Sequence, residues 1–524
     1  MRIDIFTGES NINLNFSESL KLSDIIIKNN IWLDMPCAGR GVCGKCRVRA
    51  FGALSPVSGR ERELLTQEEI ATGARLACVT YAVGDVKIEM LPAEQSQQIQ
   101  LDSDVFAANA MLNPLGTGLG IALDIGTTTL VFYLLDLTSG DVLNTYAAVN
   151  PQNIFGADVV SRIENALDGG SRELADSIRN CINDGAAALC ENYAVSDVSA
   201  FVVTGNTAML YFLTERSPES IATAPFIPNS YFGEMLTGGD IGLENFADAV
   251  VYLPRCISAY VGADITVGAV ACGYLDDGDC RRNTSLFVDI GTNGEMILAN
   301  DGKFYACSTA AGPALEGVGV SFGMPARPGA ISKIYVQDGK ICFETVGGEN
   351  PIGICGSGIV DLVAAMLEIG VIDTTGYILD SGHDFEGWVT EVDEQRIFQL
   401  PGTEIRVLQS DIRAVQYSKA AICAGIKTLA KFAGCGLGDI DEVLIAGGFG
   451  SFLDARCAEK IGLLPHGFAK KSRIMGNTAV AGAAMLLKNT DYIAKSEKFA
   501  KNVEVVELAT NDDFMNIYIC EMMF

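Results

Sequence analysis

Four cysteines near the start of the chain have the spacing of ligands for an iron–sulfur cluster. Cys37, Cys43 and Cys46 lie within ten residues, and Cys78 follows after a gap of 31 residues. Three thiolates from one loop and a fourth from a distant segment are typical of [2Fe–2S] sites, whose plant-type spacing is C-x4-C-x2-C…C. The chemistry that this pattern predicts is the transfer of one electron at a time.

A structural zinc site is the alternative interpretation of the same cysteines. Zinc sites usually use two C-x2–4-C pairs, whereas this chain has one such pair and a solitary fourth ligand. The first spacing, C-x5-C, is similar to that of adrenodoxin-like ferredoxins. Gly39, Gly41 and Gly44 would let the backbone pass close to the sulfurs and direct N–H groups at them. The spacing favours the [2Fe–2S] cluster, and we expect the other twelve cysteines to be small buried hydrophobes.

The segments around these cysteines predict the fold that must position them. Apolar alternation predicts paired strands at 2–6 and 11–16, a helix at 19–30, and later strands at 46–51 and 85–91. This is the order of a β-grasp ferredoxin. We therefore expect a [2Fe–2S] ferredoxin domain at 1–92, followed by a linker at 93–116 that lacks periodicity.

A second kind of motif occurs twice in the rest of the chain. "IALDIGTTTLVFYLLD" at 121–136 is similar to "LFVDIGTNGEMILAN" at 286–300, and each is an apolar strand, an Ile-Gly-Thr turn and a second strand. A later pair, "AFVVTGNTAML" at 200–210 and "VLIAGGFGSFL" at 443–453, repeats in the same order. Two ordered copies predict two similar α/β lobes facing each other, at about 117–280 and 281–524.

The chemistry of these turns is phosphate binding. Gly and Thr at the tip of a hairpin present backbone N–H groups and hydroxyls to an anion. The Asp at each strand end can hold water on a Mg²⁺ ion that bridges phosphates. "AGGFG" lets the backbone approach an adenosine closely. The candidate nucleotide- and magnesium-binding residues are Asp124, Gly126, Thr127 and Thr128 in the first hairpin, Asp289, Gly291, Thr292, Asn293 and Gly294 in the second, and Gly447, Gly448 and Phe449 in the later turn.

Charge and the remaining motifs exclude several classes of function. The net charge is −28, yet residues 1–92 hold 11 basic and 11 acidic residues, so the whole excess lies in the remainder. An acidic chain argues against nucleic acid and anionic membrane surfaces as partners. The chain has no P-loop motif, no signal peptide and no membrane-length apolar run. We expect a cytoplasmic protein.

Together the hairpins and the "AGGFG" turn resemble the pattern of the actin, hexokinase and acetate-kinase (ASKHA) superfamily. A ferredoxin domain fused to such lobes resembles the reductive activators of corrinoid proteins. Further similar stretches are "NPQNIFGADVVSRI" (150–163), "GNTAM" (205–209), "YVGAD" (260–264), "ACSTAAGPALEG" (306–317) and "GICGSGIVDLV" (353–363). Longer family members carry an extra middle domain, for which the linker expected here leaves no room.

The resemblance implies an ATP-dependent activator that passes one electron from its cluster to the Co(II) state of a corrinoid protein and restores Co(I). It implies a [2Fe–2S] cluster, ATP and Mg²⁺ as cofactors, a corrinoid protein and an upstream low-potential donor as partners, and is compatible with a homodimer. Glu295 and Asp264 are alternative candidates for activating the attacking water. Asp158 and Arg162 could reach the site or lie on a helix surface.

Three other functions stay open at this point. The chain could donate electrons to another low-potential metalloenzyme, although activators of that kind usually hold a 4Fe–4S cluster between two subunits. It could be a redox-sensing, nucleotide-binding module without turnover. It could be a kinase for a sugar or acyl group, because fold alone does not fix function.

Overall fold

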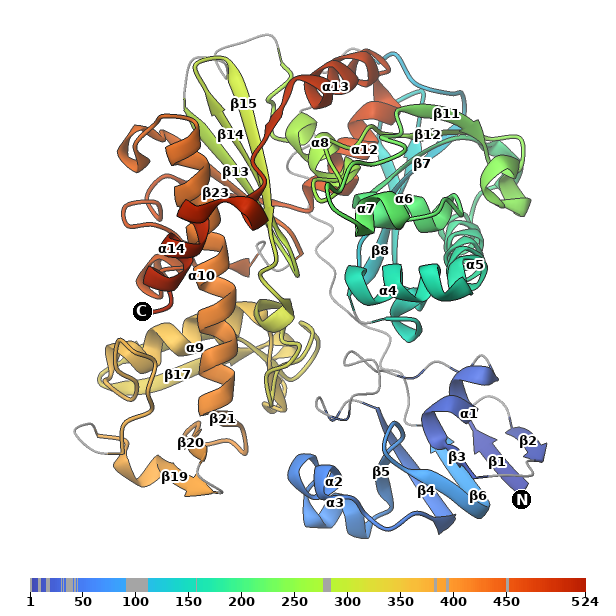
Figure 1. Ribbon diagram of the computed structural model, residues 1–524. Coiled ribbons are helices and arrows are strands. Elements are labelled where there is room, and N and C mark those ends of the chain that lie inside the picture. Colours follow the sequence, from blue (N-terminus) through green and yellow to red (C-terminus); the bar gives the residue numbers. More distant parts are fainter. Residues whose placement is uncertain are drawn as a thin grey trace.

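The chain folds into an N-terminal unit around one sheet and two larger lobes around two further sheets (Figure 1). A computed structural model describes residues 2–7, 11–15, 19–29, 31, 33, 41, 44, 46–90, 112–156, 158–276, 284–380, 384–392, 395–448 and 452–524.

The N-terminal sheet has the strand order β2-β1-β6-β4-β5, with β3 also paired to β6. β1 and β2 form an antiparallel hairpin, while β1 and β6 are parallel. Apolar residues of β1, α1 and β6, such as Ile5, Ile25 and Ile88, fill the space between the sheet and α1. The elements are β1 (Arg2–Phe6), β2 (Asn11–Asn15), β3 (Leu20–Lys21), α1 (Leu22–Lys28), β4 (Arg47–Leu54), α2 (Gly59–Leu64), α3 (Gln67–Ala71), β5 (Ala74–Leu76) and β6 (Tyr81–Met90). The predicted β-grasp order is confirmed.

The two larger sheets share the topology of five strands, and the sixth strand lies at opposite edges, β11 beside β12 in the first and β24 beside β15 in the second. The first has the order β11-β12-β10-β7-β8-β9 and the second β23-β22-β13-β14-β15-β24. In each, an antiparallel three-stranded meander continues into parallel strands, β10 beside β7 and β22 beside β13. The strands are β7 (Leu119–Ile125), β8 (Thr129–Asp136), β9 (Val142–Val149), β10 (Val198–Gly205), β11 (Glu234–Thr237), β12 (Val250–Leu253), β13 (Ser285–Ile290), β14 (Gly294–Asn300), β15 (Lys303–Thr309), β22 (Glu442–Ala446), β23 (Ser472–Gly476) and β24 (Glu504–Val505). The predicted duplication is confirmed.

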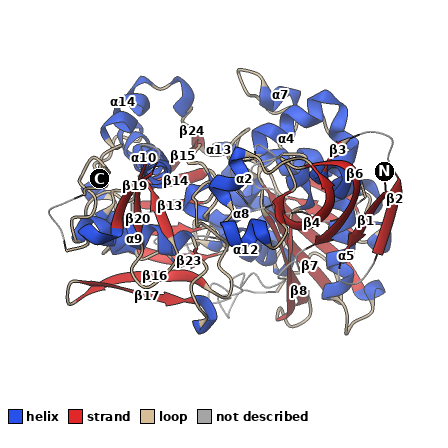
Figure 2. Cartoon of the chain, turned by 90° about the horizontal axis from the view of Figure 1, so that it is seen from below, coloured by secondary structure: helices blue, strands red, loops and turns tan. Residues whose placement is uncertain are grey.

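Helices cover these sheets, and two of them lie between the lobes. Figure 2 shows α8 and α12 between the sheet that contains β7 and the sheet that contains β13. A single hydrophobic cluster joins Val131 of β8, Phe287 of β13 and Val480 of α12. A Cβ on Gly482 of α12 would lie 1.9 Å from the carbonyl of Val267 in α8, so the close helix crossing requires glycine there. The helices are α4 (Val159–Asn165), α5 (Ser171–Leu189), α6 (Thr207–Leu213), α7 (Glu219–Ala222), α8 (Ala263–Ala271), α12 (Thr478–Lys488) and α13 (Asp491–Asn502).

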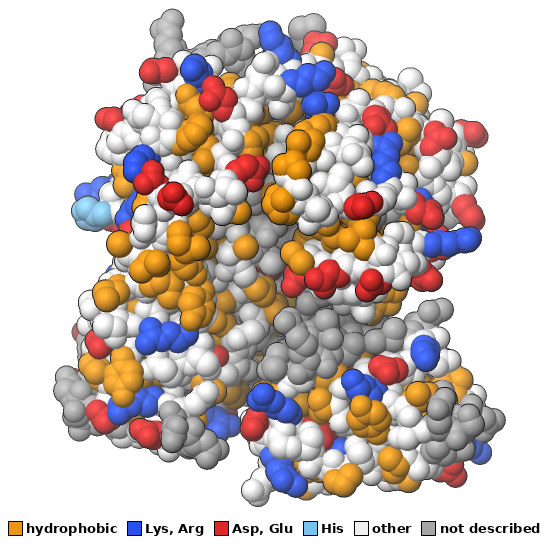
Figure 3. All heavy atoms as spheres, in the orientation of Figure 1, with side chains coloured by type: hydrophobic (Ala, Val, Ile, Leu, Met, Phe, Trp, Pro, Cys, Tyr) orange, Lys and Arg blue, Asp and Glu red, His pale blue; other side chains and the backbone are white. Residues whose placement is uncertain are grey.

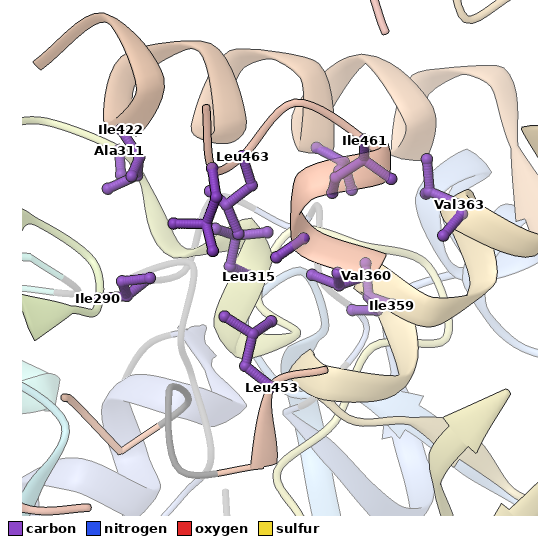
Figure 4. Packing of buried hydrophobic residues seen from close by; sticks show 14 of the residues in the cluster. Ile290, Ala311, Leu315, Ile359, Val360, Val363, Ile422, Leu453, Ile461 and Leu463 are labelled. Carbon is purple, nitrogen blue, oxygen red and sulfur yellow. The ribbon is translucent and has the colours of Figure 1, made fainter. Parts of the chain in front are cut away.

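The second lobe carries an additional subdomain beneath its sheet. Figure 4 shows Ile290 at the end of β13 and Leu315 in one hydrophobic cluster with residues of α9 and α10 and with Ile461, which follows α11 (Ala455–Lys460), so this core is continuous with the second hairpin. Beyond it, Met515, Ile519 and Met523 are 57, 62 and 61% exposed, and Figure 3 shows hydrophobic side chains gathered on this side. The elements are β16 (Ala330–Gln337), β17 (Lys340–Thr345), β18 (Gly353–Ile354), α9 (Gly356–Glu368), β19 (Val389–Val392), β20 (Gln395–Gln399), β21 (Arg406–Leu408), α10 (Gln409–Phe432), α11 (Ala455–Lys460) and α14 (Asp512–Cys520).

The segment predicted as a linker is partly visible. Residues 93–111 lie outside the described residues. The backbone of Asn113 and Leu115 donates hydrogen bonds to Lys488 and Leu487 at the end of α12, at 3.0 and 2.9 Å. The last residues of the predicted linker are therefore held by the C-terminal end of α12. Among the helices that the structure describes, none combines the length and the apolar character needed to span a membrane.

Candidate functional site

The first Ile-Gly-Thr hairpin is a tight turn between β7 and β8. The N–H of Gly126 donates to the carbonyl of Thr129 at 2.9 Å, and a Cβ on Gly126 would lie 2.7 Å from that oxygen. Asp124 lies at the end of β7, opposite Thr204 of β10. The turn therefore places Asp124 and the loop Gly126–Thr128 at the same edge of the first sheet.

Three hydrogen-bond donors hold the carbonyl groups of this loop: the backbone and the side chain of Asn150, and the side chain of Arg162. Asn150 donates its backbone N–H to the Thr128 carbonyl and its side-chain amide to the Gly126 carbonyl, both at 2.8 Å. Arg162 donates to the Thr127 carbonyl at 2.7 Å. In a trans peptide the C=O and the following N–H point in opposite directions. The N–H groups that follow these three carbonyls therefore face the other side of the loop, which is the arrangement that an anion requires.

The second hairpin, between β13 and β14, is held differently. Gly291 donates to the Asn293 carbonyl at 2.9 Å, and the Thr292 carbonyl accepts from Gly312 at 2.8 Å. The Thr292 hydroxyl donates to the carboxylate of Glu316 at 2.8 Å. A Cβ on Gly294 would lie 2.1 Å from Ile422 of α10, so packing against that helix requires glycine at this position.

Five carboxylates surround the two hairpins, and we call them the interlobe carboxylates: Asp124, Asp264, Asp289, Glu295 and Glu316. Burial raises the pKa of Asp264 to about 6 and that of Asp289 to about 7, where Asp264 and Glu316 add repulsion. Burial, then Asp264 and Asp289, raises the pKa of Asp124 well above its ordinary value, and the same two residues act on Glu295. Asp124 and Asp289 come from different lobes, and they lie close enough for the charge of one to act on the other.

These oxygen donors suit a Mg²⁺ ion held through water. In the parts of the chain that the structure describes, no group of three or more acidic, His or Cys side chains forms a preformed metal site. The pKa values of these carboxylates are raised, and a bound cation would lower them again, because its positive charge favours the ionised form. The residues therefore fit a hydrated cation between the lobes, with Asp124 near the end of β7 and Asp289 near the end of β13.

The predicted adenosine turn reaches the same place. Gly447 has a φ of +99°, and a Cβ there would lie 2.8 Å from a carboxylate oxygen of Asp289. Nothing lies within 4 Å of the Cβ position of Gly448. Phe449 lies outside the described residues. The predicted turn therefore lies directly against the second hairpin at Gly447.

The structure resolves the roles of Asp158 and Arg162. Asp158 caps the N-terminus of α4, because its carboxylate accepts from the Ser161 N–H at 2.8 Å. Arg162 is 1% exposed and reaches the first hairpin, so it is not a helix-surface residue.

Sequence reasoning missed Glu316, Asn150 and Asn477. Asn477 hydrogen bonds to Asp124 and caps α12, just as Asn206 caps α6 and donates to the Thr127 hydroxyl at 3.2 Å. The signal was present, because "GNTA" at 205–208 recurs at 476–479. The second copy brings a residue that follows β23 of the second lobe to the first hairpin.

The described part of the predicted cluster site is compact. Cys37 and Cys43 lie outside the described residues, but Cys46 and Cys78 are buried, and the N–H of Cys78 donates to the Cys46 sulfur at 3.5 Å. Gly41 and Gly44 have φ values of +73° and +66°, which favour glycine. N–H···S bonds and buried thiolates fit an iron–sulfur cluster.

Glu61 fixes the segment that carries Cys78. Its carboxylate accepts from Arg75 at 2.7 Å, from the Leu76 N–H at 3.2 Å and from the Thr80 hydroxyl at 2.9 Å. Burial raises the pKa of Glu61, but these hydrogen bonds outweigh it and lower the pKa to about 2. This buried ion pair therefore ties α2 to the turn at Cys78.

A duplicated pair of lobes with facing phosphate-type hairpins, preceded by a β-grasp unit with buried cysteines, defines an ASKHA fold joined to a ferredoxin-like domain. Family models agree with this class. The model for the C-terminal domain of RACo, the ASKHA domain, matches residues 283–524, and the model for the RACo middle region matches residues 119–277. The family's middle region thus coincides with the first lobe.

Individual relatives point to the same family. The corrinoid activation enzyme RamQ of Eubacterium limosum is 35% identical over 422 residues, which cover 77% of this chain and 70% of RamQ. The [Co(II) methylated amine-specific corrinoid protein] reductase of Methanosarcina barkeri is 26% identical over 438 residues, 77% of each chain. The chain belongs to the family of reductive activators of corrinoid proteins.

A solved structure and a partial match complete the comparison. The structure of a reductive activator for corrinoid, iron-sulfur protein matches with a TM-score of 0.73 and 29% identity, covering 100% of this chain and 98% of its own. A 72-residue stretch, 14% of this chain, is 35% identical to part of a component of the Na(+)-translocating NADH-quinone reductase of Psychrobacter cryohalolentis, covering 18% of that protein.

Proposed function

We propose that this protein is an ATP-dependent reductive activator that transfers one electron from a [2Fe–2S] cluster to the Co(II) state of a corrinoid protein and restores Co(I). One observation carries the proposal. A domain with buried Cys46 and Cys78 is joined, on one chain of this family, to two lobes whose hairpins face each other across unneutralised carboxylates.

The proposed division of labour follows the domains 1–92 and 117–524, with the lobes at about 117–280 and 281–524. Cys37, Cys43, Cys46 and Cys78 would hold the cluster, which supplies one electron when bound. The first loop, with Thr127 and Thr128, and the second loop, with Thr292 and Asn293, would bind the phosphates of ATP. Asp124 and Asp289 would hold the water shell of Mg²⁺, and Gly447, Gly448 and Phe449 would contact the adenosine.

Asp264 and Glu295 are both candidates for positioning the attacking water. Burial raises the pKa of each carboxyl. A bound cation would lower both pKa values again and favour the ionised form, which can accept the proton of a water molecule.

The proposed activity combines two reactions, the hydrolysis of ATP and the transfer of one electron. Water attacks the γ-phosphorus of ATP, the bond to the ADP oxygen breaks, and ADP, phosphate and a proton leave. One electron passes to Co(II), giving Co(I), and a low-potential donor replaces that electron. ATP can drive the uphill transfer only if the nucleotide states of the lobes bind the Co(II) partner with different affinities.

The test is an anaerobic spectrum. We would mix the reduced full-length protein with a Co(II) corrinoid protein, with and without Mg-ATP, and follow the visible band of Co(I). An ATP-dependent rise of that band supports the proposal. Cluster reduction without Co(I) from any corrinoid protein tested would favour an ATP-driven donor to another metalloenzyme. ATP binding without turnover would favour a redox-sensing module.

A further inference from the structure

Arg162 of α4 is a fully buried cation directly behind the first phosphate loop. Its side chain is 1% exposed. It donates from Nε to the Gly156 carbonyl at 2.9 Å, from Nη2 to the Thr127 carbonyl at 2.7 Å, and from Nη1 towards the Met209 sulfur at 3.6 Å. All three acceptors are neutral.

The charge of Arg162 has no ion-pair partner among the residues that the structure describes. The nearest acidic influence is Asp158, whose carboxylate is engaged with Ser161 at the start of α4. Burial lowers the pKa of Arg162 to about 10, and Asp158 opposes this in part. Burying a charge without a counter-ion is costly, and an apolar side chain of similar length would fill the space without that cost. Packing alone therefore does not explain an arginine here.

The surrounding backbone is shaped to hold this side chain. A Cβ on Gly156 would lie 2.8 Å from the backbone nitrogen of Arg162 and 2.5 Å from the Ser161 hydroxyl, so glycine lets the turn close onto α4. Figure 1 shows α4 at one end of the first lobe. The guanidinium thereby spans from the start of α4 to the loop carbonyl of Thr127.

We propose that Arg162 is a positioning residue for nucleotide binding, which holds the Thr127 carbonyl back so that the next N–H faces the phosphates and supplies, through the loop, the positive charge that a polyphosphate neutralises. This inference rests on the proposed function, because it assumes that the first loop binds phosphate. The bound polyphosphate would be the counter-charge that Arg162 does not find among the residues that the structure describes. The contribution of Arg162 must then grow with the charge of the nucleotide.

The experiment compares three full-length variants with the wild type: Arg162→Met, Arg162→Lys and the control Arg179→Met. Arg179 is a mostly buried arginine of the same lobe that also donates to a carbonyl, that of Leu213, but has acidic partners and lies away from the hairpin. Calorimetry with Mg²⁺ present would measure the dissociation constants of ATP, ADP and adenosine. Steady-state assays would separate KM for ATP from kcat.

The proposal predicts a charge-graded loss. Arg162→Met should weaken ATP about tenfold, ADP less and adenosine less than twofold, because the Coulomb energy scales with ligand charge. KM should rise more than kcat falls. Arg162→Lys keeps the charge but loses the fork of donors, so it should weaken ATP binding less than Arg162→Met does. Arg179→Met should leave all three dissociation constants unchanged.

The contrary results are distinct. An equal loss for all three ligands, no loss for ATP, or an Arg162→Lys variant as weak as Arg162→Met would overturn the role of Arg162. If Arg162→Met does not fold, a loss of tenfold or more in the folded lysine variant overturns the proposal in the same way. A wild type that binds no ATP would instead overturn the proposed function.

Discussion

Buried charged groups have opposite surroundings in the N-terminal domain and between the two lobes. In the N-terminal domain, Glu61 is fully buried but meets Arg75 at 2.7 Å, and its pKa falls to about 2. Between the lobes, Asp289 lies among other carboxylates and its pKa rises to about 7. Arg162 is the reverse case, a buried cation whose acceptors are neutral.

The contrast separates structural charges from functional ones. A buried ion pair with complete hydrogen bonds offsets its own desolvation and fixes the segment around Cys78. Unpaired buried charges are costly to the folded protein and persist where a ligand supplies the missing partner. Carboxylates that await a cation and an arginine that awaits a polyanion together describe a site for a magnesium nucleotide.

The largest effect is expected from Asp124→Asn. Removing this charge should lower ATP turnover about 10³-fold, because a charge that positions the metal acts directly on the transition state. The cluster spectrum should be unchanged, since Asp124 lies in the first lobe. Steady-state ATPase assays check this, with the exposed Asp141→Asn as the control. Turnover retained in Asp124→Asn would remove the proposed role in metal binding.

Glu61→Gln should break the buried ion pair with Arg75 and destabilise the N-terminal domain. Loss of one member of a buried pair costs about 3 kcal/mol, because Arg75 is left without its counter-charge. We expect earlier loss of cluster absorbance in urea, with ATP affinity unchanged. The control is Glu63→Gln, because the side chains of Glu63 and its partner Arg60 are 59 and 60% exposed. Equal urea midpoints for both variants would contradict the structural role of Glu61.

The pH dependence should have opposite signs in the two regions. Glu61 stabilises the folded state above its unfolded pKa of about 4.3, and this stability is lost as the pH falls towards 2. Asp289 retains its proton when folded while the unfolded chain loses it above about pH 3.9. The free energy of unfolding therefore falls as the pH rises towards 7, by up to about 1.4 kcal/mol per pH unit.

Thermal melts of the nucleotide-free protein between pH 5 and 8 test the loss of stability with rising pH that is expected from Asp289. The melting temperature should fall as the pH rises, and the Asp289→Asn variant should show a flatter dependence. Added Mg²⁺ should also flatten it. A wild type that becomes more stable towards pH 8 would show that the interlobe carboxylates are compensated after all.

The smallest effect is expected from Glu316→Gln. The amide can still accept from the Thr292 hydroxyl but removes a negative charge beside the second loop. ATP should then bind about threefold more tightly, the opposite direction to Arg162→Met. Calorimetry checks this, with the exposed Glu349→Gln as the control. Weaker ATP binding in Glu316→Gln would mean that the carboxylate itself takes part in holding the loop or the metal.

The sequence predicts the fold and the loops well because their signals are local. Strand–turn–strand patterns at Asp124 and Asp289 need no distant information, and their repetition implies the two lobes. The residues behind the loops are harder, because Asn150, Arg162 and Glu316 reach them from 20 or more positions along the chain. A helix of alternating character around Arg162 does not reveal that its arginine faces inward.

Asn477 shows a different limit. Its "GNTA" motif is a repeat in the sequence, yet the sequence does not show that the second copy crosses from β23 to the first lobe and reaches Asp124. That contact depends on α12 packing between the sheets, where Gly482 meets α8. Tertiary packing, not local propensity, decides it.

The most direct measurement compares Co(I) formation by the wild type and by Asp124→Asn in one anaerobic experiment. Both proteins are reduced until their cluster spectra match, mixed with a Co(II) corrinoid protein, and given Mg-ATP. The proposed function requires that the Co(I) band rises in the wild type only when ATP is present and does not rise in Asp124→Asn. Equal Co(I) formation by both proteins, or formation without ATP, would contradict a reduction driven from the interlobe site.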